Sequence, residues 1–267
     1  MQKNTVKQRL QAGELVYGTS LTECFAAEFA VLLKAAGMDF FFVDTEHSPA
    51  DYHQIQAICR AARGADILPM VRVTENLPFL ITRTLDVGAM GLVIPRVHSA
   101  AQARAAVEMM KYPPTGRRGF GMRSIITDHR WTNAVDEMRS ADQETLAVCQ
   151  IESKEGLSEV EEIARTPNLD VLFIGPYDLT ISMGIAEQFE TATFWDAVDR
   201  VIAACTQAGI AAGLQTGDMA QLQEARRRGV RFLLYSNDVT VLFEGYRNAI
   251  RELHQTTGLA SLQGTRL

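Results

Sequence analysis

Cysteine is scarce in this chain, and the few cysteines show no pairing pattern. The 267 residues contain four, which are Cys24, Cys59, Cys149 and Cys205. They are scattered and form no C-x-x-C pair, so the sequence offers neither a disulfide framework nor a structural zinc site. Dispersed thiols without partners are typical of a reducing compartment. We therefore expect a cytoplasmic protein.

Long apolar runs are also lacking. No uninterrupted apolar segment approaches the ~20 residues needed to cross a bilayer. The first residues, Met1–Lys7, lead into a polar helix rather than an apolar signal core. We therefore expect no membrane partner. What remains is an ordinary globular composition, with 47% hydrophobic and 22% charged residues.

Basic charge is in the minority. Lys and Arg number 26 against 32 Asp and Glu, which gives a net charge of −6. Nucleic-acid binding needs a basic face, so we expect no nucleic-acid partner. The one tight basic run, Arg226–Arg228, stands at the end of a helical segment just before Gly229. Cations suit that position because of the helix dipole, and a solvated helix end explains the run better than a binding patch.

The sequence has no G-x-G-x-x-G motif after its first strand-like segment, which disfavours an open doubly wound sheet that binds a dinucleotide. Instead, short apolar segments alternate with helical ones, and apolar runs without period-two alternation suit a parallel sheet buried on both faces. The predicted strands are residues 14–21, 39–46, 66–73, 91–97, 145–152, 169–175, 210–215 and 232–236. Eight such units in about 250 residues predict a (β/α)8 TIM barrel.

The expected helices follow the strands with short, glycine-marked turns. They are residues 5–12, 26–36, 50–62, 76–86, 99–110, 157–164, 194–208, 218–228 and 241–254. We expect one barrel domain over residues 1–254 and a polar, flexible tail over 255–267. The alternation of strands and helices is interrupted only between Lys111 and Asn133. Loops this long in a compact domain are usually functional or mobile.

Two acids stand at the ends of neighbouring predicted strands. Glu152 follows the apolar run Ala147–Ile151, and Asp178 follows the strand that begins at Val171. The active site of such a barrel lies at the carboxyl ends of its strands, so both carboxylates can converge on one divalent cation. Oxygen ligands favour hard cations such as Mg²⁺ or Mn²⁺. The alternative is that each acid merely caps the following helix, since Asp is a favoured N-cap.

Two further polar side chains end the second and third predicted strands. His47 follows Asp44 and Glu46, and a histidine can take or give a proton near neutrality. A purely structural histidine is the alternative. Arg72 ends an apolar strand and needs an anionic partner there. That partner is either a substrate carboxylate or enolate oxygen, or Glu46 or Asp44 in an ion pair.

A series of motifs, in this order and spacing, resembles a known family. The motifs are Asp44-Thr-Glu-His47, Val71-Arg72, Leu85-Asp86-Val-Gly88, Val93-Ile-Pro95, Tyr112-Pro-Pro-Thr-Gly116 with Arg118-Gly119, Gln150-Ile-Glu152 and Phe173-Ile-Gly-Pro-Tyr-Asp178. The resemblance covers nearly the whole chain. The family is that of the class II, metal-dependent pyruvate aldolases, typified by 4-hydroxy-2-oxoheptanedioate aldolase and 2-keto-3-deoxy sugar-acid aldolases.

The resemblance implies a role for each matching residue. Glu152 and Asp178 would hold a divalent metal ion, Mg²⁺ or Mn²⁺ with Co²⁺ also accepted, and a pyruvate unit would chelate it. Arg72 would bind the substrate and stabilise its enolate oxygen. His47 would orient or deprotonate a water on the metal, and Asp86 of a neighbouring subunit would polarise His47.

The same resemblance implies the substrate contacts and the reaction. Gln150 would touch the substrate, and the backbone around Gly175, Pro176, Tyr177 and Asp178 would hold the pyruvate carboxylate. The expected activity is reversible cleavage of a 4-hydroxy-2-oxo acid to pyruvate plus an aldehyde. Two alternatives stay open: a related CoA-thioester lyase or pyruvate-enolate enzyme with an unusual acceptor, and a barrel that only binds an oxo acid.

Members of this family are typically hexamers, built as trimers of dimers that exchange their last barrel helix, so residues 241–254 are the candidate for exchange. The chain also departs from the family pattern. Tyr177 replaces a small residue, Arg96 stands where an apolar or small residue is usual, and His98 follows it. With the loop after Arg118, these residues are expected to shift the aldehyde partner toward an acidic or bulky one.

Overall fold

The computed structural model describes residues 2–121, 125, 129 and 133–257. The strands are β1 (Val16–Leu21), β2 (Phe40–Asp44), β3 (Leu68–Arg72), β4 (Gly91–Ile94), β5 (Leu146–Ile151), β6 (Val171–Ile174), β7 (Ala211–Thr216) and β8 (Phe232–Asn237). The helices are α1 (Thr5–Gln11), α2 (Ala27–Ala35), α3 (Tyr52–Ala65), α4 (Pro78–Asp86), α5 (Ala100–Met110), α6 (Ala134–Glu144), α7 (Lys154–Ser158), α8 (Val160–Ala164), α9 (Pro176–Met183), α10 (Ala192–Ala208), α11 (Met219–Arg228) and α12 (Asp238–Thr257).

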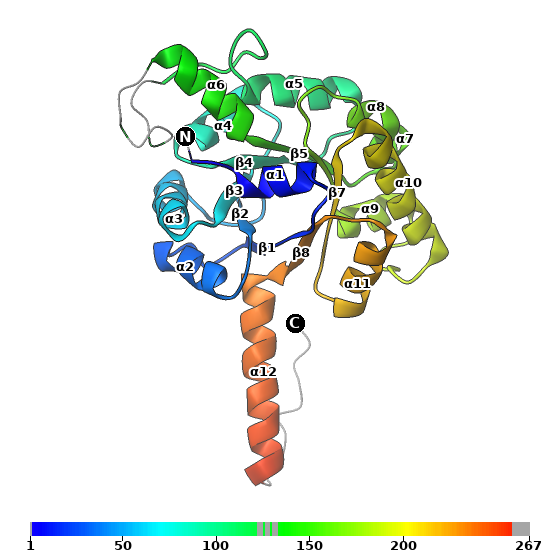
Figure 1. Cartoon of the computed structure of the whole chain (residues 1–267). Coiled ribbons are helices and arrows are strands. Elements are labelled where there is room, and N and C mark those ends of the chain that lie inside the picture. The colour runs from blue at the N-terminus through cyan, green and yellow to red at the C-terminus, as the bar shows by residue number, and fades with distance from the viewer. Residues whose placement is uncertain (1, 122–124, 126–128, 130–132, 258–267) are drawn as a thin grey trace.

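The strands form one closed sheet in the order β1 to β8, and every neighbouring pair is parallel. Helices surround this sheet (Figure 1). The expected (β/α)8 barrel is therefore confirmed, and the open doubly wound alternative is excluded. Because all strands run the same way, their carboxyl ends meet at one end of the barrel, where the active site of this fold lies.

Aromatic side chains fill the inside of the barrel. Phe40, Phe42, Phe173 and Phe232 belong to one buried cluster, and the rings of Phe40 and Phe232 stack with their centroids 4.1 Å apart. Gly18 of β1 faces this stack, and a Cβ atom there would overlap the Phe40 ring. Strand β1 can close the barrel beside the ring only because residue 18 has no side chain.

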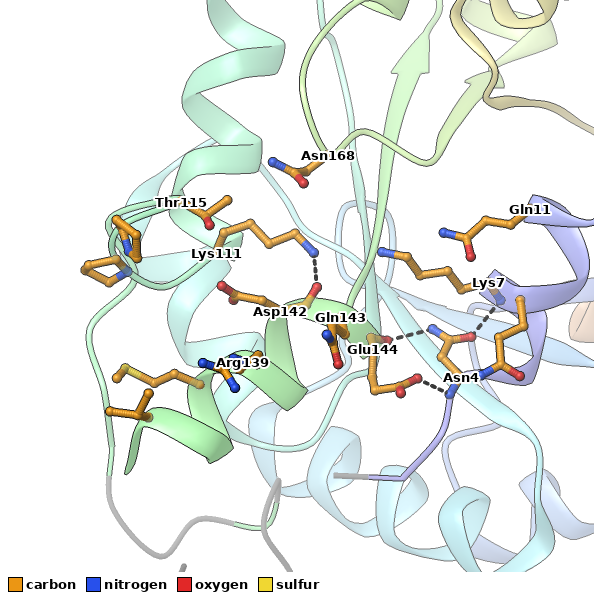
Figure 2. Close-up of a pocket in the computed structure, with 15 residues that line it drawn as sticks. Asn4, Lys7, Gln11, Lys111, Thr115, Arg139, Asp142, Gln143, Glu144 and Asn168 are labelled. Carbon is orange, nitrogen blue, oxygen red and sulfur yellow. Dashed lines mark hydrogen bonds between the residues drawn. The ribbon is translucent and has the colours of Figure 1, made fainter. Parts of the chain in front are cut away.

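Helix α1 closes the opposite, amino-terminal end of the barrel. Lys7 donates to the Thr145 carbonyl at 3.0 Å and pairs with Asp170 at 3.0 Å. The buried Lys111 donates to the same carbonyl at 3.1 Å. Both lysines line a cavity of about 610 Å³ at this end, with their ammonium groups pointing toward each other (Figure 2). These contacts fix α1 and the start of β5, far from the carboxyl ends of the strands.

Two helices were not expected from the sequence. Helix α6 buries only Ala141, so its sequence shows almost none of the apolar periodicity that identifies a helix. Helix α9 is eight residues long, begins directly after β6 at Pro176 and ends at Gly184 with φ 76°. Its Gly-Pro start and short length are typical of a turn rather than a helix. Of the long loop 111–133, residues 122–124, 126–128 and 130–132 lie outside the described residues.

Helix α12 is longer than expected, because it covers Asp238–Thr257 rather than 241–254. The first three residues of the expected flexible tail, 255–257, are therefore helical, and residues 258–267 lie outside the described part of the chain. Figure 1 shows α12 projecting away from the barrel instead of lying against it. Its exposed apolar side chains are Val239, Val241, Leu242, Phe243, Tyr246, Ile250 and Leu253.

Two findings bear on the chain's environment. All four cysteines are free thiols, and three of them are buried. In the described part of the chain, no helix has both the length and the apolar character that a membrane crossing requires.

Candidate active site

A cavity of about 390 Å³ opens at the carboxyl ends of the strands, a size suited to a small organic substrate. It is lined by His47, Arg72, Gln150, Gly175, Pro176, Tyr177 and Asp178, all predicted from the sequence. The remaining lining residues are Ser20, Thr22, Asp44, Phe173, Gln215, Thr216, Gly217, Ser236, Asn237 and Thr240. Of the predicted site residues, Glu152 lies behind this lining and Asp86 lies apart from it.

Glu152 is the buried acid of the site, with 6% of its surface exposed. Its Oε1 accepts a hydrogen bond of 2.6 Å from the backbone N–H of Arg96, and its Oε2 accepts one from the side-chain amide of Gln150. A Cβ atom at Gly175 would lie 2.8 Å from Glu152 Oε2. The carboxylate therefore occupies space that only a glycine at position 175 leaves open.

The electrostatic surroundings of Glu152 disfavour its charged form. Burial is the main cause and raises the pKa of Glu152 to about 7, and the nearby carboxylates of Asp178 and Glu46 add to the shift. The Arg96 amide acts in the opposite direction. A second acid close to a buried carboxylate is unfavourable unless a cation lies between them. The donor set therefore fits a hard divalent ion.

The capping alternative fails for both acids. Helix α7 is capped by Ser153, whose side chain accepts from the Gly156 amide. Helix α9 has Gly175 as its N-cap and no side-chain capping bond, and Asp178 lies within its first turn.

Among the residues the structure describes, no three His, Cys, Asp or Glu side chains are grouped to hold a metal. The protein would thus supply two carboxylates and leave the other positions to substrate and water.

Arg72 is held in place by acids of the β2 end. Asp44 and Arg72 are partners in the strand register, and Arg72 Nε donates to Asp44 Oδ1 at 2.9 Å while Nη2 donates to Oδ2. Glu46 Oε2 lies 3.5 Å from the same Nε. Of the two partners that the sequence left open for Arg72, the ion pair with Asp44 is present. Arg72 also lines the cavity, and its contact with a substrate oxygen stays a prediction. The bidentate pair fixes the guanidinium at the cavity wall.

His47 lies at the accessible edge of the cavity, with 63% of its side chain exposed. Its Nε2 is 4.0 Å from Glu46 Oε2. Asp44 Oδ1 accepts from the backbone N–H of Glu46 at 2.9 Å and of His47 at 3.4 Å. One buried carboxylate thus fixes both Arg72 and the turn that carries His47.

Asp86 lies at the end of α4, where its Oδ1 pairs with Arg118 Nη2 at 2.8 Å. Within one chain it does not line the cavity that contains His47. The expected partner of Asp86 is the histidine of a neighbouring subunit, so its catalytic role stays a prediction.

The contribution of β1 to the cavity was missed. Ser20 and Thr22 line the cavity, and Gln215 Nε2 donates to Ser20 Oγ at 2.7 Å and to the Ser236 carbonyl at 2.8 Å. The signal was present, because small polar residues end the first predicted strand as they end the others. Phe173 was missed for a different reason: it reaches the cavity from inside an apolar strand and carries no polar atom.

Known proteins resemble this chain over most of its length. Residues 24–244 match the family described as HpcH/HpaI aldolase/citrate lyase. The hydroxypyruvate/pyruvate aldolase of Paraburkholderia phytofirmans is 35% identical over 256 residues, covering 94% of this chain and 97% of that protein. The 4-hydroxy-2-oxo-heptane-1,7-dioate aldolase of Salmonella dublin is 33% identical over 245 residues, covering 91% and 92%.

The crystal structure of an HpcH/HpaI aldolase from Desulfitobacterium hafniense superposes with a TM-score of 0.91 at 30% identity, covering 96% of this chain and 99% of that one. The expected resemblance to pyruvate aldolases is confirmed, and with it the enzyme class of carbon–carbon lyase. This chain belongs to the HpcH/HpaI aldolase/citrate lyase family.

Proposed function

We propose that the enzyme is a metal-dependent aldolase that reversibly cleaves a 4-hydroxy-2-oxo acid to pyruvate and an aldehyde. The observation that carries this proposal is the buried Glu152 carboxylate, which lies near Asp178 behind the floor of the cavity. Relatives named as pyruvate and 4-hydroxy-2-oxo acid aldolases support the choice of reaction.

Glu152 and Asp178 are the proposed ligands of a divalent ion, Mg²⁺ or Mn²⁺. Such an ion supplies a Lewis acid beside the ketone oxygen of the substrate. The fit rests on two acids whose mutual repulsion a cation would relieve and on the lack of a side chain at Gly175, where a Cβ atom would crowd the Glu152 carboxylate. Gln150, Gly175, Pro176 and the backbone at Tyr177 form the adjoining wall, where the pyruvate unit would bind.

Arg72 and His47 supply the remaining chemistry. Cleavage of the carbon–carbon bond leaves negative charge on the ketone oxygen, and a guanidinium that Asp44 already holds in place can stabilise this charge with little reorganisation. His47 is accessible at the cavity edge. It is therefore placed to accept the proton of the 4-hydroxyl group, directly or through one water.

Exchange of α12 between subunits is proposed on separate grounds. The helix carries exposed apolar residues along its length, with Tyr246 72% and Leu253 56% exposed, and it projects away from the barrel (Figure 1). On the barrel, Val31 and Leu32 of α2 are also more than half exposed. Exposed apolar surface of this kind marks a protein interface. A second copy of the chain, contributing its own α12, would cover both surfaces in a homo-oligomer.

The decisive assay is pyruvate formation from a 4-hydroxy-2-oxo acid with and without added Mn²⁺. We expect activity with the ion, loss of activity with a chelator, and at least a hundredfold lower kcat in Glu152→Ala. Full activity of Glu152→Ala in the presence of chelator would refute the metal role. A CoA thioester should fail to compete with pyruvate, which separates the aldolase from a thioester lyase.

The expected cytoplasmic location stays a prediction.

A further inference from the structure

We propose that Arg96 is a positioning residue of this active site, which fixes Glu46 through its side chain while its backbone holds Glu152. The inference rests on the proposed function, because it concerns the same site. Nothing in the sequence motifs assigns Arg96 this role; it stands out there only as an unusual residue after Pro95.

The backbone of Arg96 has an unusual conformation. Its φ is 53°, in the left-handed region that residues with a side chain seldom adopt and that clusters at functional sites. In this conformation its N–H donates to Glu152 Oε1 at 2.6 Å. The guanidinium reaches a second acid, with Nε 2.9 Å from Glu46 Oε1 and Nη2 bonded to the same oxygen. One residue thus contacts two acids of the site through two separate groups.

Glu46 is the residue that Arg96 constrains. Its side chain is only 5% exposed, and Arg96 occupies its Oε1. Its other oxygen, Oε2, lies 3.5 Å from Arg72 Nε and 4.0 Å from His47 Nε2. Because Oε1 is taken, Oε2 stays directed at the arginine and the histidine. Without the guanidinium, this buried carboxylate would turn to another cation. The Glu46 carboxylate would then pair with Arg72, where it would compete with Asp44, or with an ion held by Glu152.

The backbone contact does not depend on the Arg96 side chain. The next residue, Val97, donates its N–H to the Gln150 carbonyl at 3.3 Å, and His98 Nδ1 lies 2.7 Å from Ser153 Oγ. The residues that follow Pro95 are therefore joined to the end of β5 by their own contacts. The Arg96 side chain is 55% exposed, so its removal empties no core volume. The two functions of Arg96 can consequently be separated by mutation.

Arg96→Gly is the separating variant, because glycine accepts a left-handed φ and keeps the backbone N–H. We expect kcat to fall about tenfold through the misplaced Glu46, with little change in KM. Mn²⁺ affinity, measured by titration with electron paramagnetic resonance, should stay the same or increase, since a positive charge near the ion is removed. Arg96→Lys should recover part of kcat. Combining Arg96→Gly with Glu46→Gln should add no loss beyond the larger single effect.

Arg200→Ala is the matched control. Arg200 also pairs with a glutamate, with Nε and Nη2 2.9 Å and 3.0 Å from the Glu161 carboxylate, but this pair is exposed on both sides and neither residue lines the cavity. This variant should change neither kcat nor Mn²⁺ affinity. Three outcomes would each overturn the inference. The first is an unchanged kcat in Arg96→Gly, and the second is a parallel loss of kcat, Mn²⁺ binding and melting temperature in that variant. The third is an additive loss of kcat when Arg96→Gly is combined with Glu46→Gln. If the wild type binds no Mn²⁺, the proposed function fails first, and the inference falls with it.

Discussion

At the scale of single residues, the burial of Glu152 connects ion binding to stability. Its pKa is raised to about 7, mainly by burial, against an unfolded value of about 4.3. A raised carboxyl pKa favours the fold fully below the unfolded value, and this contribution is lost as the pH rises through 7. The ion-free protein therefore becomes less stable over this window because the site must bear an uncompensated charge.

Glu152→Gln should remove this pH dependence. In ion-free urea unfolding, the variant should gain stability relative to the wild type as the pH rises from 4.5 to 8, by up to about 3 kcal/mol. At pH 8, Mn²⁺ should raise the melting temperature of the wild type and leave that of the variant unchanged. Equal stabilisation of both proteins by Mn²⁺ would contradict the assignment of Glu152 as a ligand.

Asp238 is a second residue with a decisive local role, because it ties the start of α12 to the end of β1. Its carboxylate accepts from the backbone amides of Thr22 at 2.9 Å, Glu23 at 3.0 Å and Cys24 at 2.6 Å, and from the Thr22 hydroxyl at 2.9 Å. Burial alone would raise its pKa. The bonds from Cys24, Thr22 and Glu23 outweigh burial, and the pKa of Asp238 lies below its usual value.

Asp238→Asn should therefore destabilise the protein by about 2 kcal/mol at pH 7, since charge-assisted bonds are weakened. A depressed pKa stabilises the fold above the unfolded value near ~3.9 and loses this effect as the pH falls through the folded value. The difference between variant and wild type in urea unfolding should thus shrink in acid. A difference that is constant from pH 7 to pH 3 would show that charge is not involved.

At the scale of elements, strands were easier to predict than helices. The strands of a barrel are buried on both faces, so each appears as a mainly apolar run, as in residues 40–43 of β2. Helix α6 buries a single residue and leaves no comparable pattern. Polar residues at strand ends predicted part of the cavity lining, including His47, Arg72 and Asp178. The backbone bond of Arg96 to Glu152 could not be predicted, because the left-handed conformation of residue 96 leaves no sign in the sequence.

Helix α12 exposes apolar side chains along its length. Ile250→Glu places a charge among the exposed apolar residues of the helix and should shift the protein to smaller assemblies in size-exclusion chromatography with light scattering, because burying a lone carboxylate is unfavourable. Gln255→Glu, which adds the same charge at a polar position of the same helix, is the control. An unchanged assembly in Ile250→Glu would place the interface elsewhere.

At the scale of the whole molecule, barrel closure brings together residues that are distant in the chain. Asp44, Arg72, Gln150 and Asp178 come from four different βα units, and the sequence reveals their proximity only once a parallel barrel is assumed. Asp178→Asn should retain the fold and lower Mn²⁺ affinity at least tenfold, because one of the two proposed carboxylate ligands becomes neutral. Circular dichroism checks the fold and Mn²⁺ titration the affinity. Undiminished affinity would remove Asp178 from the ligand set.

Thr240 belongs at once to the cavity lining and to the first turns of α12. The helix that we propose to pack on another copy of the chain thus begins in the wall of the substrate cavity. The activity should then depend on protein concentration. On dilution the copies separate and the start of this helix becomes less ordered, so specific activity should decline before any secondary structure is lost.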